Sequence, residues 1–135
     1  MVSKRICMIA LALTVCGVVY AAETFEEYQT AMRAGAGANA EMRKLIESDL
    51  SGAAAAAGKV KEAFGELEAY WKAKGANDAV GFAHNVVTEA EAVRVAAAAG
   101  NKDGALAAAD RLRANCGSCH EAHRVKAADG SWQIK

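Results

Sequence analysis

The sequence contains no proline, and aromatic residues make up only 6% of its 135 residues. Long alternating runs of Val, Ile and Thr, which would predict β-strands, are also missing. Alanine and other strong helix formers are abundant instead, so helix formation meets little competition along the chain. A chain of this length has the usual size of one domain. The sequence therefore predicts one all-α domain.

An excess of positive charge is missing as well, since 16 basic residues balance 16 acidic ones. Two of the basic residues, Lys4 and Arg5, precede an apolar stretch over residues 6–19, and small residues follow up to Ala22. This pattern predicts a secretory signal peptide over residues 1–22, because the apolar run is shorter than the roughly 20 residues that span a membrane. Its removal leaves 14 of the 16 basic residues and a net charge of about −2 on residues 23–135. We therefore expect a periplasmic protein that neither binds nucleic acid nor inserts stably into a membrane.

Four stretches repeat apolar residues at spacings of three and four, as amphipathic helices do. They run from Thr24 to about Asp49, along the stripe from Ala57 to Trp71, from about Asn77 to Ala99, and from Ala105 to about Lys126. The third stretch carries its predicted apolar stripe at Val80, Ala83, Val87, Ala90 and Val93. Thr24 and Glu27 fit a capping box at the start of the first stretch, and Gly75 and Gly100 mark the ends of the second and third. Because short polar turns join the stretches, we expect an antiparallel, up-and-down four-helix bundle over residues 23–135.

Reactive side chains are concentrated in one pattern near the carboxyl end, Cys116-Gly117-Ser118-Cys119-His120. The other two of the four cysteines lie in residues 1–22, so Cys116 and Cys119 are the only thiols of residues 23–135. The C-x-x-C-H pattern is typical of covalent attachment of haem c. Each thiol adds to one vinyl group of the porphyrin, and His120 then supplies its imidazole to the iron as the proximal ligand. On a helix, Cys116 and His120 are four residues apart and share one face.

C-x-x-C pairs also occur in redox disulfides and in zinc sites, and each of these requires different surroundings. A thioredoxin-like motif expects a neighbouring βαβ unit, which this sequence lacks. A structural zinc site needs four ligands, and His84 and His123 do not form a second pair at metal-binding spacing. A simple disulfide would close a very small loop and add little stability. These contrasts favour one covalent haem, and a haem-free helical interaction module with a C-x-x-C disulfide is the alternative from another class.

A signal peptide, four helical stretches and a C-x-x-C-H motif near the carboxyl end resemble class II c-type cytochromes, the cytochrome c prime family and its low-spin relatives. The resemblance covers residues 24–124. Arg124 matches the basic residue that follows the motif in this family, whereas His123 stands where the family usually has Tyr or Phe. The resemblance implies that Arg124 contacts a haem propionate or the proximal imidazole. Family members often dimerise through their helices, so a homodimer is a further expectation.

The resemblance also implies where the second axial ligand lies. The stretch Tyr28-Gln29-Thr30-Ala31-Met32 is similar to the family segment that faces the iron, and this register places Met32 there. Cytochrome c prime proteins usually have a bulky, non-ligating residue at that position, whereas their low-spin relatives have Met. We therefore expect Met32 to be the distal iron ligand, with His84 as a weaker candidate. Met42 lies ten residues beyond Met32, roughly 15 Å along a helix, and is expected in the core.

Taken as a set, these residues predict a periplasmic electron carrier rather than an enzyme. The protein is expected to hold one haem c, to cycle its iron between Fe(III) and Fe(II), and to exchange electrons with redox partner proteins. The alternative within the same family is a five-coordinate protein that binds small gases such as NO or CO, in which Met32 only lines the pocket.

Overall fold

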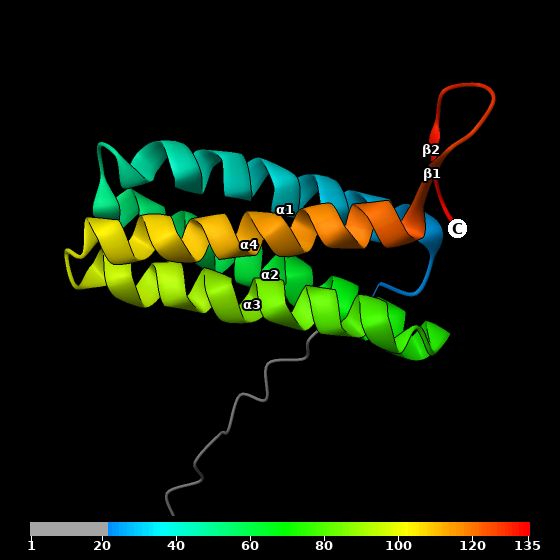
Figure 1. The fold of residues 1–135 in the computed structure, drawn as a ribbon, viewed down its shortest axis with the longest axis horizontal. Coiled ribbons are helices and arrows are strands. Elements are labelled where there is room, and N and C mark those ends of the chain that lie inside the picture. Colours follow the sequence, from blue (N-terminus) through cyan, green and yellow to red (C-terminus); the bar gives the residue numbers. More distant parts are fainter. Residues whose placement is uncertain (1–21) are drawn as a thin grey trace, which may run out of the picture.

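The computed structural model describes residues 22–135, so the predicted signal peptide lies outside the described residues apart from Ala22. The described chain forms four helices, α1 (Phe25–Ile46), α2 (Leu50–Lys74), α3 (Asn77–Ala98) and α4 (Lys102–His123), followed by two short strands, β1 (Arg124–Lys126) and β2 (Trp132–Ile134). The helices run alternately in opposite directions along one long axis (Figure 1). This arrangement confirms the predicted four-helix bundle. Within residues 22–135, no helix is both long enough and apolar enough to cross a membrane.

Local signals in the sequence set the helix ends. The capping box predicted for α1 is present, because the Thr24 hydroxyl accepts a hydrogen bond from the Glu27 amide and the Glu27 carboxylate accepts one from the Thr24 amide. Asp49 caps α2 in a similar way by accepting a hydrogen bond from the Gly52 amide. Gly75 and Gly100 follow α2 and α3 with φ of 72° each, a left-handed conformation that favours glycine because it has no Cβ.

The bundle core is built from alanine and a few larger aliphatic side chains. The largest fully buried side chains are Met42, Ile46, Leu67, Leu112, Val60, Val86 and Val93. Met42 therefore lies in the core, as predicted. On α3, however, the buried face carries Ala79 and Val86, whereas Val80 and Val87 of the predicted stripe are only partly buried. Because alanine occurs on more than one face of α3, the packing of α2 and α4 decides which face is buried.

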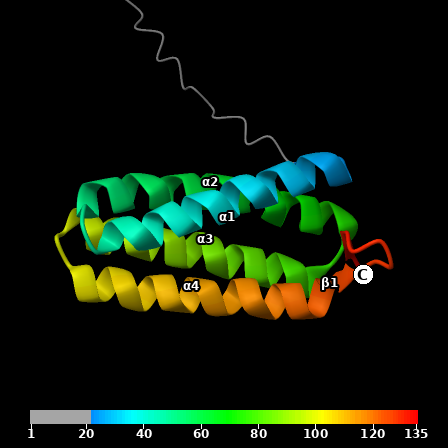
Figure 2. The same ribbon diagram turned by 90° about the horizontal axis from the view of Figure 1, so that it is seen from above.

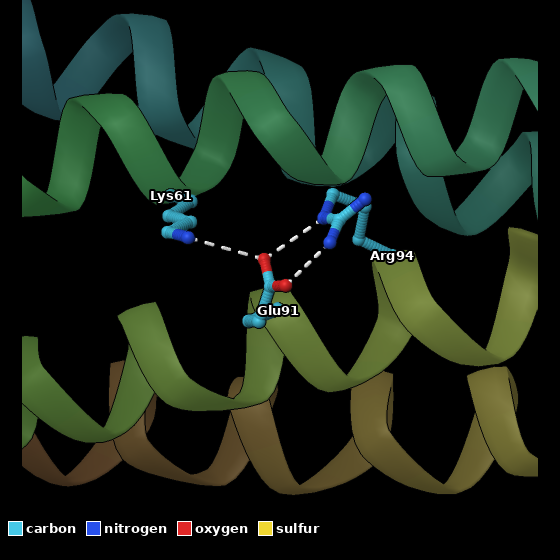
Figure 3. A network of polar contacts seen from close by, with 3 residues as sticks. All are labelled: Lys61, Glu91 and Arg94. Atoms are coloured by element: carbon cyan, nitrogen blue, oxygen red, sulfur yellow. Dashed lines mark hydrogen bonds and ion pairs between the residues drawn. The ribbon is translucent and has the colours of Figure 1, made fainter.

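Ion pairs on the surface connect neighbouring helices. Lys61 of α2 approaches Glu91 of α3, with 3.2 Å between Nζ and Oε2, and Arg94 holds the same carboxylate through two hydrogen bonds of 2.6 and 2.9 Å (Figure 3). The two cations thus share one carboxylate at the contact between α2 and α3. Exposed pairs of this kind contribute modestly to stability, so the buried apolar face holds the bundle together.

Helices α1 and α4 are the neighbours that contact each other least. They are joined where α1 ends and α4 begins, through Arg43 and Asp110 at 2.9 Å and through Lys102 and Glu47. From there the two helices diverge toward the start of α1 and the end of α4 (Figure 2). The divergence leaves room between α1 and α4 at the end of the bundle that carries the C-x-x-C-H motif.

The chain beyond α4 differs from the sequence prediction. Helix α4 ends at His123 instead of continuing to about Lys126, because residues 124–126 pair with residues 132–134 as an antiparallel hairpin. Gly130 has φ of 84° in the connecting turn, and the Asp129 carboxylate accepts hydrogen bonds from the amide and hydroxyl of Ser131. The hairpin projects from the end of the bundle where α1 begins (Figure 1). Strands of three residues are too short to show an alternating pattern, so no pattern in the sequence predicted them.

Candidate functional site

Two adjoining cavities occupy the space between the diverging helices α1 and α4. The first, of about 180 Å³, extends toward the middle of the bundle and is lined mainly by apolar side chains from all four helices. The second, of about 300 Å³, opens at the hairpin end and is lined by α1, α4 and the hairpin. Met32, Cys119 and His120 line both cavities, and Cys116 lines the first. We refer to the two cavities together as the crevice.

The crevice brings together the predicted site residues from opposite ends of the sequence. Cys116, Cys119 and His120 lie on one side, because their spacing along α4 places them on one face of that helix. Met32 lies across from them on α1 and is partly buried. Met32 and the C-x-x-C-H motif thus line the same cavities. The crevice has the donor set expected for a covalent haem: two thiols, an imidazole beside them, and a thioether on the facing helix.

Burial adjusts the charge state of His120. Desolvation lowers the pKa of the His120 imidazole below its ordinary value, and the nearby positive charge of Arg124 lowers it further. The imidazole is therefore neutral at neutral pH and keeps a nitrogen lone pair that can bind a metal.

Burial has the opposite effect on the two thiols. Cys116 and Cys119 are both free, without a disulfide between them. Burial raises the pKa of Cys116, and burial together with the negative charges of Cys116 and Asp78 raises the pKa of Cys119 to about 11. Catalytic C-x-x-C pairs show the reverse, a lowered pKa that produces a thiolate, commonly at the amino end of a helix. These two cysteines lie near the carboxyl end of α4, so the site is poorly suited to thiol–disulfide exchange.

The two residues that follow the motif have specific partners. His123 Nε2 lies 2.8 Å from Asp78 Oδ2, and the His123 ring packs 5.1 Å from the Trp71 ring. This contact ties the end of α4 to the start of α3. The Arg124 guanidinium lies 3.7 Å over the Trp132 ring and lines the second cavity together with His120. Arg124 thus lines the crevice, and its planar group stacks on an aromatic ring of the hairpin.

His84, the weaker candidate for the distal ligand, and Asn39, which was not predicted to belong to the site, lie in different surroundings. His84 is exposed, pairs with Glu68 at 3.4 Å, and lines neither cavity of the crevice. Asn39 lines the first cavity, and its buried Oδ1 atom has no hydrogen-bond partner within residues 22–135. A buried acceptor without a hydrogen bond lowers the stability of the fold. Asn39 Oδ1 is therefore an acceptor at the inner end of the crevice that a hydrogen-bond donor would stabilise.

Aromatic side chains form much of the crevice wall, and sequence reasoning did not assign them to it. Phe64 and Trp71 of α2 line the first cavity, Tyr28 of α1 lines the second, and Trp132 reaches the second from the hairpin. Tyr28 also packs on Trp71 with 5.5 Å between ring centroids. The apolar spacing along α1 and α2 predicted the buried faces of these helices, but not that part of each face borders a cavity.

Comparison of the chain with protein-family models, with curated proteins and with solved structures found no match. Within residues 22–135, no three His, Cys, Asp or Glu side chains come together as a ligand set for a metal ion. The described part of the chain thus offers no four-ligand zinc site around Cys116 and Cys119.

Proposed function

We propose that this protein is an electron carrier with one covalently bound haem c. One observation carries the proposal: the Cys116 and Cys119 thiols, the His120 imidazole and the Met32 thioether line a single crevice between diverging helices. In this proposal the two thiols form thioether bonds to the porphyrin, His120 is the proximal iron ligand and Met32 is the distal one. This ligand set is the one found in the low-spin relatives within the class II c-type cytochromes, the family that the sequence resembles.

The chain's own residues would hold and tune the cofactor. When bound, the haem supplies one-electron Fe(III)/Fe(II) chemistry. Phe64, Trp71 and Tyr28 give the crevice an aromatic, largely apolar wall, and an apolar surrounding is one of the means by which a protein sets a reduction potential. Arg124 stands at the open end with a fixed positive charge, which suits a carboxylate of the cofactor.

The proposal is tested by producing the full chain in a periplasm that contains haem-maturation proteins. We expect a red protein whose mass after denaturation still includes that of the haem. Its amino terminus should lie at about residue 23. Cys116→Ser and Cys119→Ser should each lose one thioether bond, which shifts the absorption bands of the reduced protein. A colourless product under these conditions would refute the proposal and favour a haem-free helical module.

The distal ligand is tested with a pair of methionine variants. Met32→Leu preserves the side-chain volume but removes the sulfur, so we expect a high-spin spectrum, ready binding of carbon monoxide and a lower reduction potential. Met42→Leu is the matched control, because Met42 is fully buried and lies outside the crevice. Its spectrum should match that of the unaltered protein.

The competing function is gas binding by a five-coordinate iron, and the apolar lining of the first cavity favours it as the second candidate. Small neutral gases are accommodated by such a lining without polar groups. If the unaltered protein is already high-spin and binds carbon monoxide readily, Met32 is a lining residue and the protein handles gases instead of carrying electrons.

A further inference from the structure

Large apolar side chains are exposed together at the hairpin end of the bundle. Of the four exposed large hydrophobic residues in the described chain, three lie there: Phe25 at 41%, Val125 at 43% and Trp132 at 48% exposure. Phe25 begins α1, and Figure 1 places the start of α1 and the hairpin at the same end. Phe25 and Trp132 also line the second cavity, which reaches His120. An exposed apolar patch at the mouth of a site is typical of a binding surface.

Cations without carboxylate partners surround this patch. Arg124 and Lys126 lie 3.7 and 5.7 Å from the centre of the Trp132 ring, and Arg33 lines the same cavity from α1. Within residues 22–135, none of these three side chains forms an ion pair, and no carboxylate lines the second cavity. Elsewhere on the bundle, by contrast, many cations pair with carboxylates, namely Arg43, Lys59, Lys61, Arg94, Lys102 and Arg111.

Negative charge gathers on a different face. The groove between α1 and α2 is lined by five glutamates, Glu26, Glu27, Glu41, Glu62 and Glu66, with Lys59 as its one cation. On α1, Glu26 and Glu27 therefore face this groove, whereas Phe25 and Arg33 face the crevice. The chain is thus polarised, with a positive crevice mouth and a negative α1–α2 groove, although its net charge is close to zero. Such a distribution orients a charged partner before contact.

We propose that the hairpin end is the docking surface for an acidic protein electron carrier. We define this surface by Phe25, Arg33, Lys126 and Trp132, because the charge of Arg124 is assigned above to a carboxylate of the cofactor. A partner that presents carboxylates around an apolar spot would neutralise the cations and cover Phe25 and Trp132. It would then lie over the cavity that leads to His120. The proposal rests on the proposed function, because a single electron leaves the reduced carrier and is gained by the oxidised partner, and no bond forms or breaks.

The first test uses two small oxidants of opposite charge on the reduced, haem-loaded protein. We expect the rate with ferricyanide, an anion, to fall as ionic strength rises, and the rate with the tris-phenanthroline cobalt(III) cation not to fall. Lys126→Glu should slow ferricyanide about threefold or more at low ionic strength. Lys102→Glu is the control, because Lys102 lies at the opposite end of the bundle and pairs with Glu47. Equal effects of the two substitutions, or a ferricyanide rate that rises with salt, would overturn the proposal.

The second test does not depend on electron transfer. A polyglutamate peptide is titrated into the isotopically labelled protein, and amide chemical shifts are followed by NMR. We expect shifts confined to the hairpin and the start of α1, with loss of binding in Lys126→Glu. Binding of phosphatidylglycerol vesicles without any response to polyglutamate would overturn the proposal and identify a membrane surface as the occupant. A red protein that does not bind polyglutamate refutes the docking surface alone. A colourless protein that binds polyglutamate refutes the proposed function and, with it, the role of this surface in electron transfer.

Discussion

Two glycines of α1 allow a sharp test of how tightly α1 packs on α2 beside the crevice. A Cβ atom added to Gly35 would lie 2.8 Å from Cε2 and 3.1 Å from Cδ2 of Phe64, and 3.3 Å from the Ala63 Cβ. A Cβ atom added to Gly37, two residues further along the same helix, would meet nothing within 4 Å. Gly35→Ala and Gly37→Ala therefore make the same chemical change in opposite environments.

The expected difference between the two variants follows from two opposing effects. Replacing glycine by alanine inside a helix is favourable by about 1 kcal/mol, because the unfolded chain loses less conformational entropy on folding. This gain applies to both variants, so Gly37→Ala should raise the free energy of unfolding by about that amount. At Gly35 the new methyl group must displace the Phe64 ring, and overpacking of this kind costs about 1–3 kcal/mol. Gly35→Ala should therefore be less stable than Gly37→Ala by about 1–3 kcal/mol.

Urea unfolding of both variants in one buffer measures this difference through the transition midpoints and slopes. Phe64 lines the first cavity, so that cavity offers room for the displaced ring. Phe64→Leu in the Gly35→Ala background should recover part of the loss, and the double-mutant cycle isolates the clash. If Gly35→Ala stabilises the protein as much as Gly37→Ala, the close packing of α1 on Phe64 is refuted.

Three further outcomes test the core and the titrating groups. Leu112→Ala, at a fully buried position of α4, should lower the free energy of unfolding by about 2–5 kcal/mol, with the half-buried Leu106→Ala as a milder control in the same urea assay. Hydrogen bonds from Arg94, and secondarily from Lys61, lower the pKa of Glu91 to about 2. The contribution of the ionised Glu91 carboxylate to stability is therefore present above pH 4.5 and is lost as the pH falls toward 2. Glu91→Gln should flatten the dependence of the free energy of unfolding on pH in that range. Burial raises the pKa of Tyr28 to about 12, so its contribution is present below pH 10 and is lost as the pH rises toward 12, and an alkaline absorbance titration should lose its latest tyrosine transition in Tyr28→Phe.

Most of the fold could be predicted from the sequence, and the errors have identifiable causes. The capping box at Thr24 and the glycines at 75 and 100 predicted helix ends correctly, because a cap depends on residues within one turn of each other. The stripe predicted for α3 was displaced by one residue at Val80 and Val87, because alanine on several faces leaves the pattern ambiguous. The start of α2 at Leu50 precedes the stripe from which the helix was predicted, since the alanine-rich first turns carry little pattern of their own.

The candidate site, too, could be predicted only in part from the sequence. The spacing of Cys116, Cys119 and His120 within one helix determined that their side chains share a face, and this required only the geometry of a helix. The resemblance to a known family, and not the spacing, placed Met32 opposite them. The hairpin that lines the open end of the crevice was not predicted, because a two-stranded hairpin needs packing such as that of Ile134 against the core and has no local pattern here.

The sequence by itself determined the four helices, most of their ends, their antiparallel order and the helix face that carries the C-x-x-C-H motif. These features depend on residues close together in the chain, where propensity, caps and helical spacing act. Only the tertiary structure decided that α1 and α4 diverge, that Met32 and His120 line one crevice, and that Arg124 and Trp132 stack at its mouth. These features depend on residues distant in sequence, and their positions are fixed by how the helices and the hairpin pack against one another.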